Sequence, residues 1–276
     1  MKTDIFHLAI LPIANILVHE EYDDSRAKPL VGKLKKDGKM VNPIIVTALG
    51  KNSYLQLDGM NRLSAFKMSG FNSILTQLID YNDQYSVDLD SWIHLFKGDL
   101  SSFIKHIESH GMEVKRGAMG DVGHRYIKEE DRGRICTIAA QNGRVFLVYS
   151  NQSLYEKVKK LRQLVKFYNQ DITRDVLPTH PNIKDLDILF SEHNDTNISV
   201  VFPTFTRHQI VDVVRHKEIF PPGLTRHVIK RRCLNVNVPL NLFNNKLGIK
   251  KQNEELEKLL NSRKFRIYEE PTIYFE

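Results

Sequence analysis

Short apolar runs separated by turn residues mark the first eighty positions of the chain. Four such runs lie at 5–18, 43–47, 54–57 and 74–79. Their length and their β-branched and large apolar side chains predict strands. Polar helical patterns lie between the runs, at about 24–36 and from 58 to a glycine at position 70. This part of the chain is therefore predicted to form one compact α+β unit with the order βαββαβ.

The remaining residues predict a second, larger region of mixed type. Two apolar runs at 135–140 and 145–150 flank an Asn-Gly pair, which is typical of a tight hairpin. A further strand is predicted at 234–238. No internal repeat or low-complexity linker interrupts the chain. The sequence thus predicts an α+β fold with an N-terminal domain at 1–82 and a second, α/β domain at 83–276.

Composition narrows the class of protein only slightly. The 276 residues carry a net charge of +7, which suits nucleic acid, a membrane surface or a phosphorylated small molecule equally well. Cys136 and Cys233 lie far apart in the sequence, so neither a disulfide framework nor a CxxC zinc site is expected. Pro12 and Asn15 interrupt the first apolar run, and no run is long enough to span a bilayer. A cytoplasmic protein fits these features best.

The stretch Asp58-Gly59-Met60-Asn61-Arg62 joins a predicted strand to a predicted helix. Glycine lets a backbone approach a phosphate closely, and a helix N-terminus offers free N–H donors. Arg62 adds a fixed positive charge, and Asp58 could hold Mg²⁺ or orient a nucleophile. The alternative is an N-cap aspartate followed by a surface arginine. The stretch is not a Walker A loop, because GxxxxGK[ST] is absent from the sequence.

Two other polar groups are candidates for chemistry. His19-Glu20 follows the first predicted strand, where a carboxylate could act as a general base or simply form a solvated turn. Thr225-Arg226-His227 follows a Pro-Pro-Gly turn and could bind a carboxylate or an amino acid, or form a polar loop. Basic runs such as the one at 230–232 are more typical of solvated surface than of a nucleic-acid interface.

The segments PIIVTA at 43–48 and YLQLDGMNRLSAFKMSG at 54–70 resemble the ParB/sulfiredoxin-like nucleotide-binding fold. In that fold a DGxHR-type loop holds nucleotide phosphates. The resemblance extends to one branch, the free L-serine kinases, which include an archaeal ADP-dependent enzyme and the serine kinase of the staphyloferrin B siderophore cluster. That branch combines a strand-end His-Glu, the loop, a Trp-containing segment and a late PxGxTR segment. This chain carries them at 19–20, 58–62, 91–92 and 221–226.

The resemblance implies a nucleotide site at the loop. Gly59, Met60, Asn61 and Arg62 would hold the phosphates of ATP or ADP through backbone N–H groups and the guanidinium. Asp58 would lie beside the transferred phosphoryl group, where it would assist the base or hold Mg²⁺.

The resemblance also implies an acceptor site for free L-serine in a cleft between the two domains. Glu20 would take the proton of the serine hydroxyl and Trp92 would form a wall of the pocket. Thr225, Arg226 and His227 would hold the carboxylate of the amino acid. The implied product is O-phospho-L-serine.

Asn61 departs from the family pattern, because the family loop has histidine at this position. Asparagine carries no positive charge and cannot shuttle a proton, so nucleotide binding could survive while turnover falls. The alternative function is therefore a non-catalytic nucleotide-binding regulator, with or without DNA binding. A kinase for another small hydroxy amino acid is a third candidate. Sulfiredoxin is disfavoured because Met60 replaces its cysteine, and the GERRxRA motif of chromosome-partitioning ParB proteins is absent.

Overall fold

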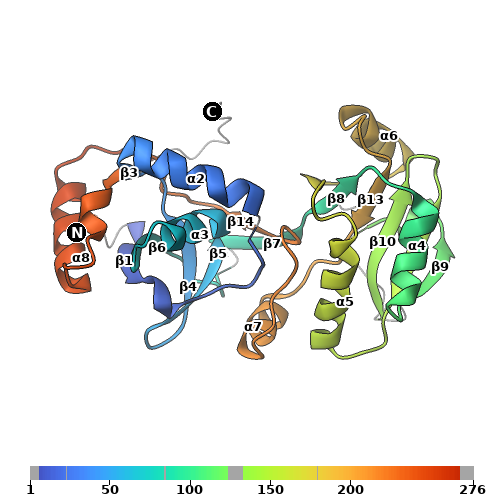
Figure 1. The fold of residues 1–276 in the computed structure, drawn as a ribbon, viewed down its shortest axis with the longest axis horizontal. Helices are drawn as coiled ribbons and strands as arrows, with labels where there is room; N and C mark the ends of the chain where they lie inside the picture. The colour runs from blue at the N-terminus through green and yellow to red at the C-terminus, as the bar shows by residue number, and fades with distance from the viewer. Residues whose placement is uncertain (1–5, 23, 84, 124–132, 179, 268–276) are drawn as a thin grey trace.

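The computed structural model describes residues 6–22, 24–83, 85–123, 133–178 and 180–267. Figure 1 shows two sheets side by side, each with its own helices. The first sheet has the order β1-β6-β4-β5-β2. Its strands are β1 (Leu8–Pro12), β2 (Ile16–Leu17), β4 (Ile44–Gly50), β5 (Ser53–Asp58) and β6 (Ser73–Leu78). Helices α2 (Asp24–Asp37) and α3 (Met60–Met68) pack against each other beside this sheet. The α+β class predicted for this part is confirmed, although the order is ββαβββαβ rather than βαββαβ.

Strand direction in this sheet explains why two distant polar segments meet. Strands β2 and β5 pair in parallel, with Ile16 opposite Tyr54 and Leu17 opposite Leu55. Both therefore leave the sheet at the same edge. The chain after β2 reaches Glu20 there, and β5 ends at Asp58.

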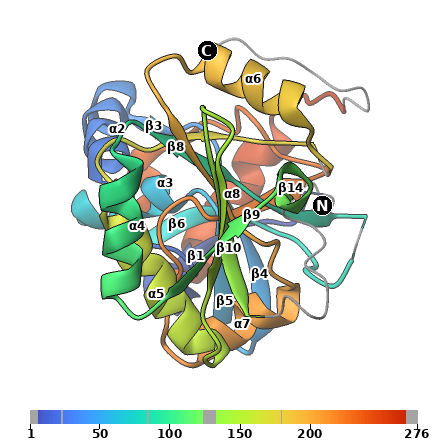
Figure 2. The ribbon, with the colours of Figure 1, turned by 90° about the vertical axis from the view of Figure 1, so that its right-hand side faces the viewer.

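The second sheet has the order β12-β8-β13-β10-β11-β9, and all its pairings are antiparallel. Its strands are β8 (Ile93–Phe96), β9 (Glu113–Gly117), β10 (Arg134–Ala140), β11 (Val145–Tyr149), β12 (Thr173–Asp175) and β13 (Ile198–Val201). Alternate residues of its strands join different cores. Ile138 packs in the core that contains α4 (Leu100–Ser109) and α5 (Leu154–Lys166), whereas Ala139 packs with α6 (Ile183–Glu192). The sheet is thus covered on both faces (Figure 2).

A two-stranded pair connects the two sheets. β7 (Val87–Ser91) and β14 (Thr225–Ile229) run antiparallel between them in Figure 1, above α7 (Arg207–Arg215). A single parallel bridge between Glu20 and Phe220 attaches the end of β2 to the chain that enters β14. The connection places the residues around 220–230 against the edge of the first sheet.

The C-terminal part of the described chain returns to the first sheet. Helix α8 (Ile249–Asn261) contacts β1, and β15 (Val238–Pro239) pairs with β3 (Lys39–Met40). Val238, Leu256 and Leu260 share one hydrophobic core with residues of the first sheet. The bounds 1–82 and 83–276 remain a prediction, but the first sheet does not build its core from residues 1–82 alone.

Two strand predictions are wrong in detail. The strand predicted at 234–238 is reduced to Val238–Pro239, because Asn235 and Asn237 take positive φ angles of 54° and 50°, which no strand tolerates. Leu234 is 60% exposed. The first apolar run forms two strands separated by a 3₁₀ turn at Ile13–Asn15. Among the described residues, no helix is both long and apolar enough to cross a membrane.

Candidate active site

All the site residues predicted from the sequence line a single cleft of about 1310 Å³. They are Glu20, Asp58, Gly59, Met60, Asn61, Arg62, Trp92, Thr225, Arg226 and His227. The cleft lies where the parallel ends of β2 and β5 face β14. The structure therefore brings together four sequence segments, of which those of Glu20 and Thr225 lie 205 positions apart.

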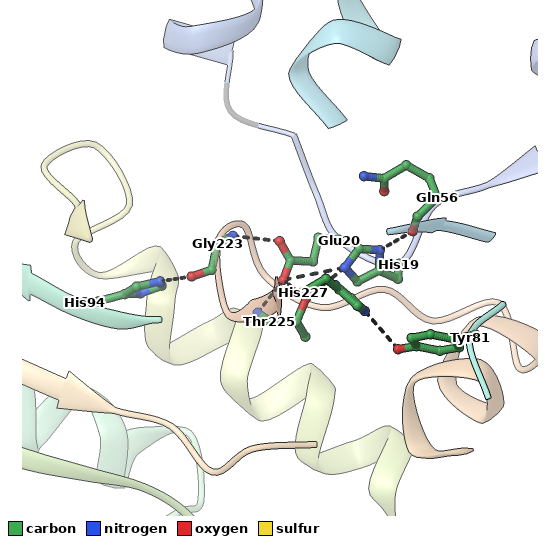
Figure 3. Close-up of polar contacts among 8 residues, drawn as sticks. All are labelled: His19, Glu20, Gln56, Tyr81, His94, Gly223, Thr225 and His227. Carbon is green, nitrogen blue, oxygen red and sulfur yellow. Dashed lines mark hydrogen bonds and ion pairs between the residues drawn. The ribbon is translucent and has the colours of Figure 1, made fainter. Parts of the chain in front are cut away.

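Glu20 is held in place by the segment that leads into β14 (Figure 3). Its Oε1 accepts hydrogen bonds from the backbone N–H and the hydroxyl of Thr225, both at 2.5 Å. Its Oε2 accepts the N–H of Gly223 at 3.0 Å. The side chain is 12% exposed. A carboxylate with three donors and restricted access to solvent has a fixed orientation, which a positioned base requires.

Gly223 must be glycine for this geometry. Its φ angle is +68°, and a Cβ atom there would lie 1.8 Å from Nε of Arg174. Its carbonyl oxygen lies 2.7 Å from Nε2 of His94, a buried residue of β8. Because a carbonyl only accepts, His94 donates through Nε2, and its Nδ1 accepts from the hydroxyl of Tyr168 at 3.1 Å. Burial lowers the pKa of His94 to about 3, so the ring is neutral.

His19 connects the Glu20 carboxylate, through Thr225, to the first sheet. Its Nδ1 lies 2.7 Å from the carbonyl oxygen of Gln56, and its Nε2 lies 2.8 Å from Oγ1 of Thr225. A hydrogen-bonded path therefore runs from Gln56 through His19 and Thr225 to Glu20 (Figure 3).

His227 lies at the same end of the cleft as His19. The two rings meet edge to face at 5.0 Å, and Nε2 of His227 lies 2.8 Å from the hydroxyl of Tyr81. Burial, together with electrostatic repulsion from the neighbouring Arg207 and Arg232, lowers the pKa of His227 well below its usual value. His227 is therefore a neutral hydrogen-bonding group, not a cation.

The predicted trio at 225–227 divides between the two faces of β14. Thr225 and His227 face His19, as the period of two in a strand requires. Arg226 faces the other way, where Nη1 lies 3.1 Å from Oδ2 of Asp90 and the guanidinium lies 5.1 Å from the centre of the Trp92 ring. The only cation of the trio thus stands beside Trp92.

The loop after β5 presents the start of α3 to the cleft. Gly59, with φ +91°, is the N-cap, and no side chain caps the helix. The alternative of an Asp58 N-cap is therefore wrong. A Cβ atom at position 59 would lie 2.8 Å from Cγ2 of Ile44 and 2.9 Å from Nη2 of Arg62. Glycine thus lets the chain turn from strand to helix in one residue, leaving the N–H groups of the first turn at a positive helix end.

Asp58 accepts two arginines on one oxygen. Its Oδ2 lies 2.6 Å from Nη1 of Arg232 and 3.2 Å from Nη2 of Arg62. Arg62 also donates to the carbonyl oxygen of Pro43 at 2.9 Å. Burial alone would raise the pKa of Asp58, but the charges of Arg232 and Arg62 and a backbone N–H from Gly59 lower it overall. Asp58 is therefore ionised at neutral pH.

The cleft is rich in cations, which include Arg26, Lys33, Lys39 and Arg174 besides those already described. Within the described residues, no cluster of three or more His, Cys, Asp or Glu side chains could hold a metal by itself. Mg²⁺ commonly uses one or two carboxylates together with substrate phosphates and water. The one carboxylate beside the loop, Asp58, fits a metal ion that arrives with a nucleotide.

Sequence reasoning missed His94 and Arg232. His94 sits in the apolar run IHLF and looks like an ordinary core residue, whereas Arg232 belongs to a basic run that is typical of surface. No local pattern signals either contact, because their partners lie 129 and 174 residues away.

The chain is similar in sequence to curated L-serine kinases. It is 24% identical over 270 residues to the ATP-dependent L-serine kinase SbnI of Staphylococcus aureus, covering 94% of this chain and 90% of that protein. It is 23% identical over 234 residues to an ATP-dependent L-serine kinase of Staphylothermus marinus, covering 84% and 89%. The ADP-dependent L-serine kinase SerK of Thermococcus kodakarensis is 20% identical, covering 76% and 82%.

Solved structures show the same fold along most of the chain. A C-terminally truncated SbnI from Staphylococcus aureus matches with a TM-score of 0.72 at 19% identity, covering 95% of this chain and 99% of that one. A free serine kinase in complex with AMP matches with a TM-score of 0.68 at 16% identity, covering 85% and 92%. No protein-family model matches the chain. The resemblance to the free L-serine kinase family is thus confirmed, in sequence and in fold, over most of the chain.

Proposed function

We propose that this protein phosphorylates free L-serine at its hydroxyl, giving O-phospho-L-serine. One observation carries the proposal: a fixed carboxylate, Glu20, and a glycine-turned helix start at 59–62 leave the same edge of one sheet and line one cleft. The first suits a hydroxyl acceptor and the second suits phosphates. The names of the curated relatives favour this function over the DNA-binding regulator considered from the sequence.

The reaction needs few protein groups, because phosphoryl transfer depends mainly on positioning and on neutralisation of charge. Glu20 takes the hydroxyl proton as the serine oxygen forms its bond to phosphorus. The bond from phosphorus to the bridging oxygen breaks, and the leaving nucleotide keeps that electron pair. The N–H groups at 60–62 and the guanidinium of Arg62 face the phosphates.

The acceptor would lie between Glu20 and the Trp92–Arg226 pair. Arg226 supplies the charge for the amino acid's carboxylate, and Asp90 fixes that guanidinium over the Trp92 ring. On the side of the acceptor that faces Glu20, Thr225 and His227 supply hydrogen-bonding groups that carry no charge.

The donor would be ATP or ADP with Mg²⁺. Relatives are named for either nucleotide, and the cations of the cleft suit a polyphosphate of either length. When bound, the metal ion would neutralise phosphate charge, and Asp58 would be its protein ligand.

The decisive experiment is a phosphoryl-transfer assay followed by ³¹P NMR. Purified protein is mixed with Mg²⁺ and L-serine, and with ATP or ADP, and Glu20→Gln is compared with Glu21→Gln as a matched control. Wild type and Glu21→Gln should form phosphoserine, whereas Glu20→Gln should be slower by about 10²- to 10⁴-fold. Absence of product from wild type with both donors, despite nucleotide binding, would establish the non-catalytic alternative.

A further inference from the structure

Arg232 lies far from the loop at 59–62 in the sequence but close to it in the structure. Its Nη1 lies 2.6 Å from Oδ2 of Asp58, across 174 positions. It lines the cleft together with the loop at 59–62. The chain that carries it has just left β14, so one ten-residue stretch runs from the Glu20 partner Gly223 to the Asp58 partner Arg232.

A buried amide fixes the backbone on both sides of Arg232. Nε2 of Gln77 donates to the carbonyl oxygen of Arg231 at 3.1 Å, and Oε1 of Gln77 accepts the N–H of Cys233 at 2.9 Å. Gln77 lies in β6 and is 6% exposed. The position of Arg232 is therefore set by the sheet, although it belongs to a surface connection with no regular structure.

The two arginines at Asp58 differ in how they are held. Arg62 also donates to Pro43 and thereby belongs to the strand edge. Arg232 reaches Asp58 through its guanidinium alone, from a backbone that Gln77 fixes. A phosphate that enters the cleft offers Arg232 a second set of oxygens with higher charge than one carboxylate. Transfer of this guanidinium from Asp58 would leave Oδ2 of Asp58 with one arginine, Arg62, instead of two.

We propose that Arg232 is a catalytic residue that binds the transferred phosphoryl group, an arginine finger supplied by the same chain. The proposal rests on the proposed function. As the serine oxygen bonds to phosphorus and the bridging oxygen departs with its electron pair, negative charge spreads over the equatorial oxygens. Arg232 neutralises this charge together with Arg62, whose guanidinium contacts the same Asp58 oxygen. Glu20 takes the proton of the serine hydroxyl in the same step.

The test compares Arg232→Ala with Arg231→Ala. The neighbouring arginine belongs to the same basic run, but its side chain does not line the cleft. Three quantities are measured: kcat for phosphoserine formation, the Kd of the product nucleotide, and rescue of kcat by added guanidinium chloride at constant ionic strength. An arginine finger contributes about 10³- to 10⁵-fold to kcat.

The expected result is a fall in kcat of at least about 100-fold for Arg232→Ala, with a change in product-nucleotide Kd below about 10-fold and partial rescue by guanidinium. Arg231→Ala should stay within about 2-fold of wild type. Equal activity of the two variants would overturn the inference. A rise in activity of Arg232→Ala would also overturn it, because it would show that the contact of Arg232 with Asp58 inhibits the reaction. Failure of wild type to form phosphoserine with either donor would instead refute the proposed function, and the finger with it.

Discussion

Nε2 of His94 donates to the carbonyl oxygen of Gly223 at 2.7 Å, and the N–H of the same glycine donates to Glu20. A buried histidine of the second sheet thereby fixes the carboxylate that extends from the first. Gly223, which lines the cleft, thus adds a link between the two sheets.

His94 should make the protein sensitive to acid. Its pKa is about 3 in the folded protein and near 6.5 in an unfolded chain, so the unfolded state binds more protons between these values. Stability therefore falls as pH drops through this window. Between pH 7 and pH 4.5 the wild-type protein should lose part of its unfolding free energy. In His94→Gln, which keeps a donor for Gly223, this loss should be smaller than in wild type by roughly 2–3 kcal/mol. Urea titrations at both pH values measure this, with the half-buried His106→Gln as control. An unchanged loss in His94→Gln would contradict the assignment.

Gly223→Ala should lower activity far more than the same substitution at a glycine whose φ angle is positive but whose surroundings are open. The added Cβ would collide with the Arg174 side chain, so either the peptide that holds Glu20 or Arg174, which also lines the cleft, must shift. We expect kcat/KM for serine to fall by at least about 100-fold, or about 2.7 kcal/mol. Gly143→Ala is the matched control, because Gly143 has φ +79° and no atom within 4 Å of the added Cβ. It should cost about 1–2 kcal/mol of stability and leave kcat/KM unchanged. Similar kinetics for both variants would argue against a role for the Gly223 peptide.

The Thr225 hydroxyl should matter through orientation of Glu20. Thr225→Val keeps the shape of the side chain and removes the hydroxyl that contacts both Glu20 and His19. We expect kcat to fall by about 10-fold or more, since a hydrogen bond to a charged group is worth about 1.5–3 kcal/mol. Thr225→Ser should stay within a few-fold of wild type. Steady-state kinetics measure this. Full activity of Thr225→Val would show that the hydroxyl does not contribute to the orientation of Glu20.

Asn61→His should give nucleotide binding a new pH dependence. Position 61 lies in the first turn of α3 and lines the cleft. A histidine there would be protonated below about pH 6.5 and would add positive charge beside the phosphates. The Kd for ADP should therefore be lower at pH 6 than at pH 8 in the variant, beyond any change in wild type. Calorimetric titration at both pH values tests this, and parallel behaviour of the two proteins would place the side chain away from the phosphates.

The first sheet is predicted from the sequence because its signals are local, whereas the gathering of the site residues is predicted only through the resemblance to the free L-serine kinases. The apolar runs at 43–47 and 54–57, and the glycine turn at position 59, each mark a strand or a strand end. The sequence does not predict strand β14, because its buried residues Thr225 and His227 are polar. Their burial depends on hydrogen-bond partners from other segments, which no local pattern contains.

Local pattern also fails to predict the contact of Arg232 with Asp58 and the loss of the strand expected at 234–238. A basic run and an apolar run suggested surface followed by strand. In the structure, Gln77 holds the backbone near Arg232, and two asparagines with positive φ end any extended run. The predicted roles of the individual site residues remain predictions, which the variants above test.

The packing of α8 on the first sheet has a consequence for synthesis of the chain. Ile10 is completely buried in a core that also contains Leu256 and Leu260. A ribosome that adds about 5–20 residues per second therefore leaves this core incomplete for roughly 10–50 s after its first strand emerges. The second sheet, whose last strand in the sequence ends at Val201, is synthesised completely before α8. The first sheet must stay soluble with an uncovered apolar face until then, and we expect it to be the part of the nascent chain that chaperones bind.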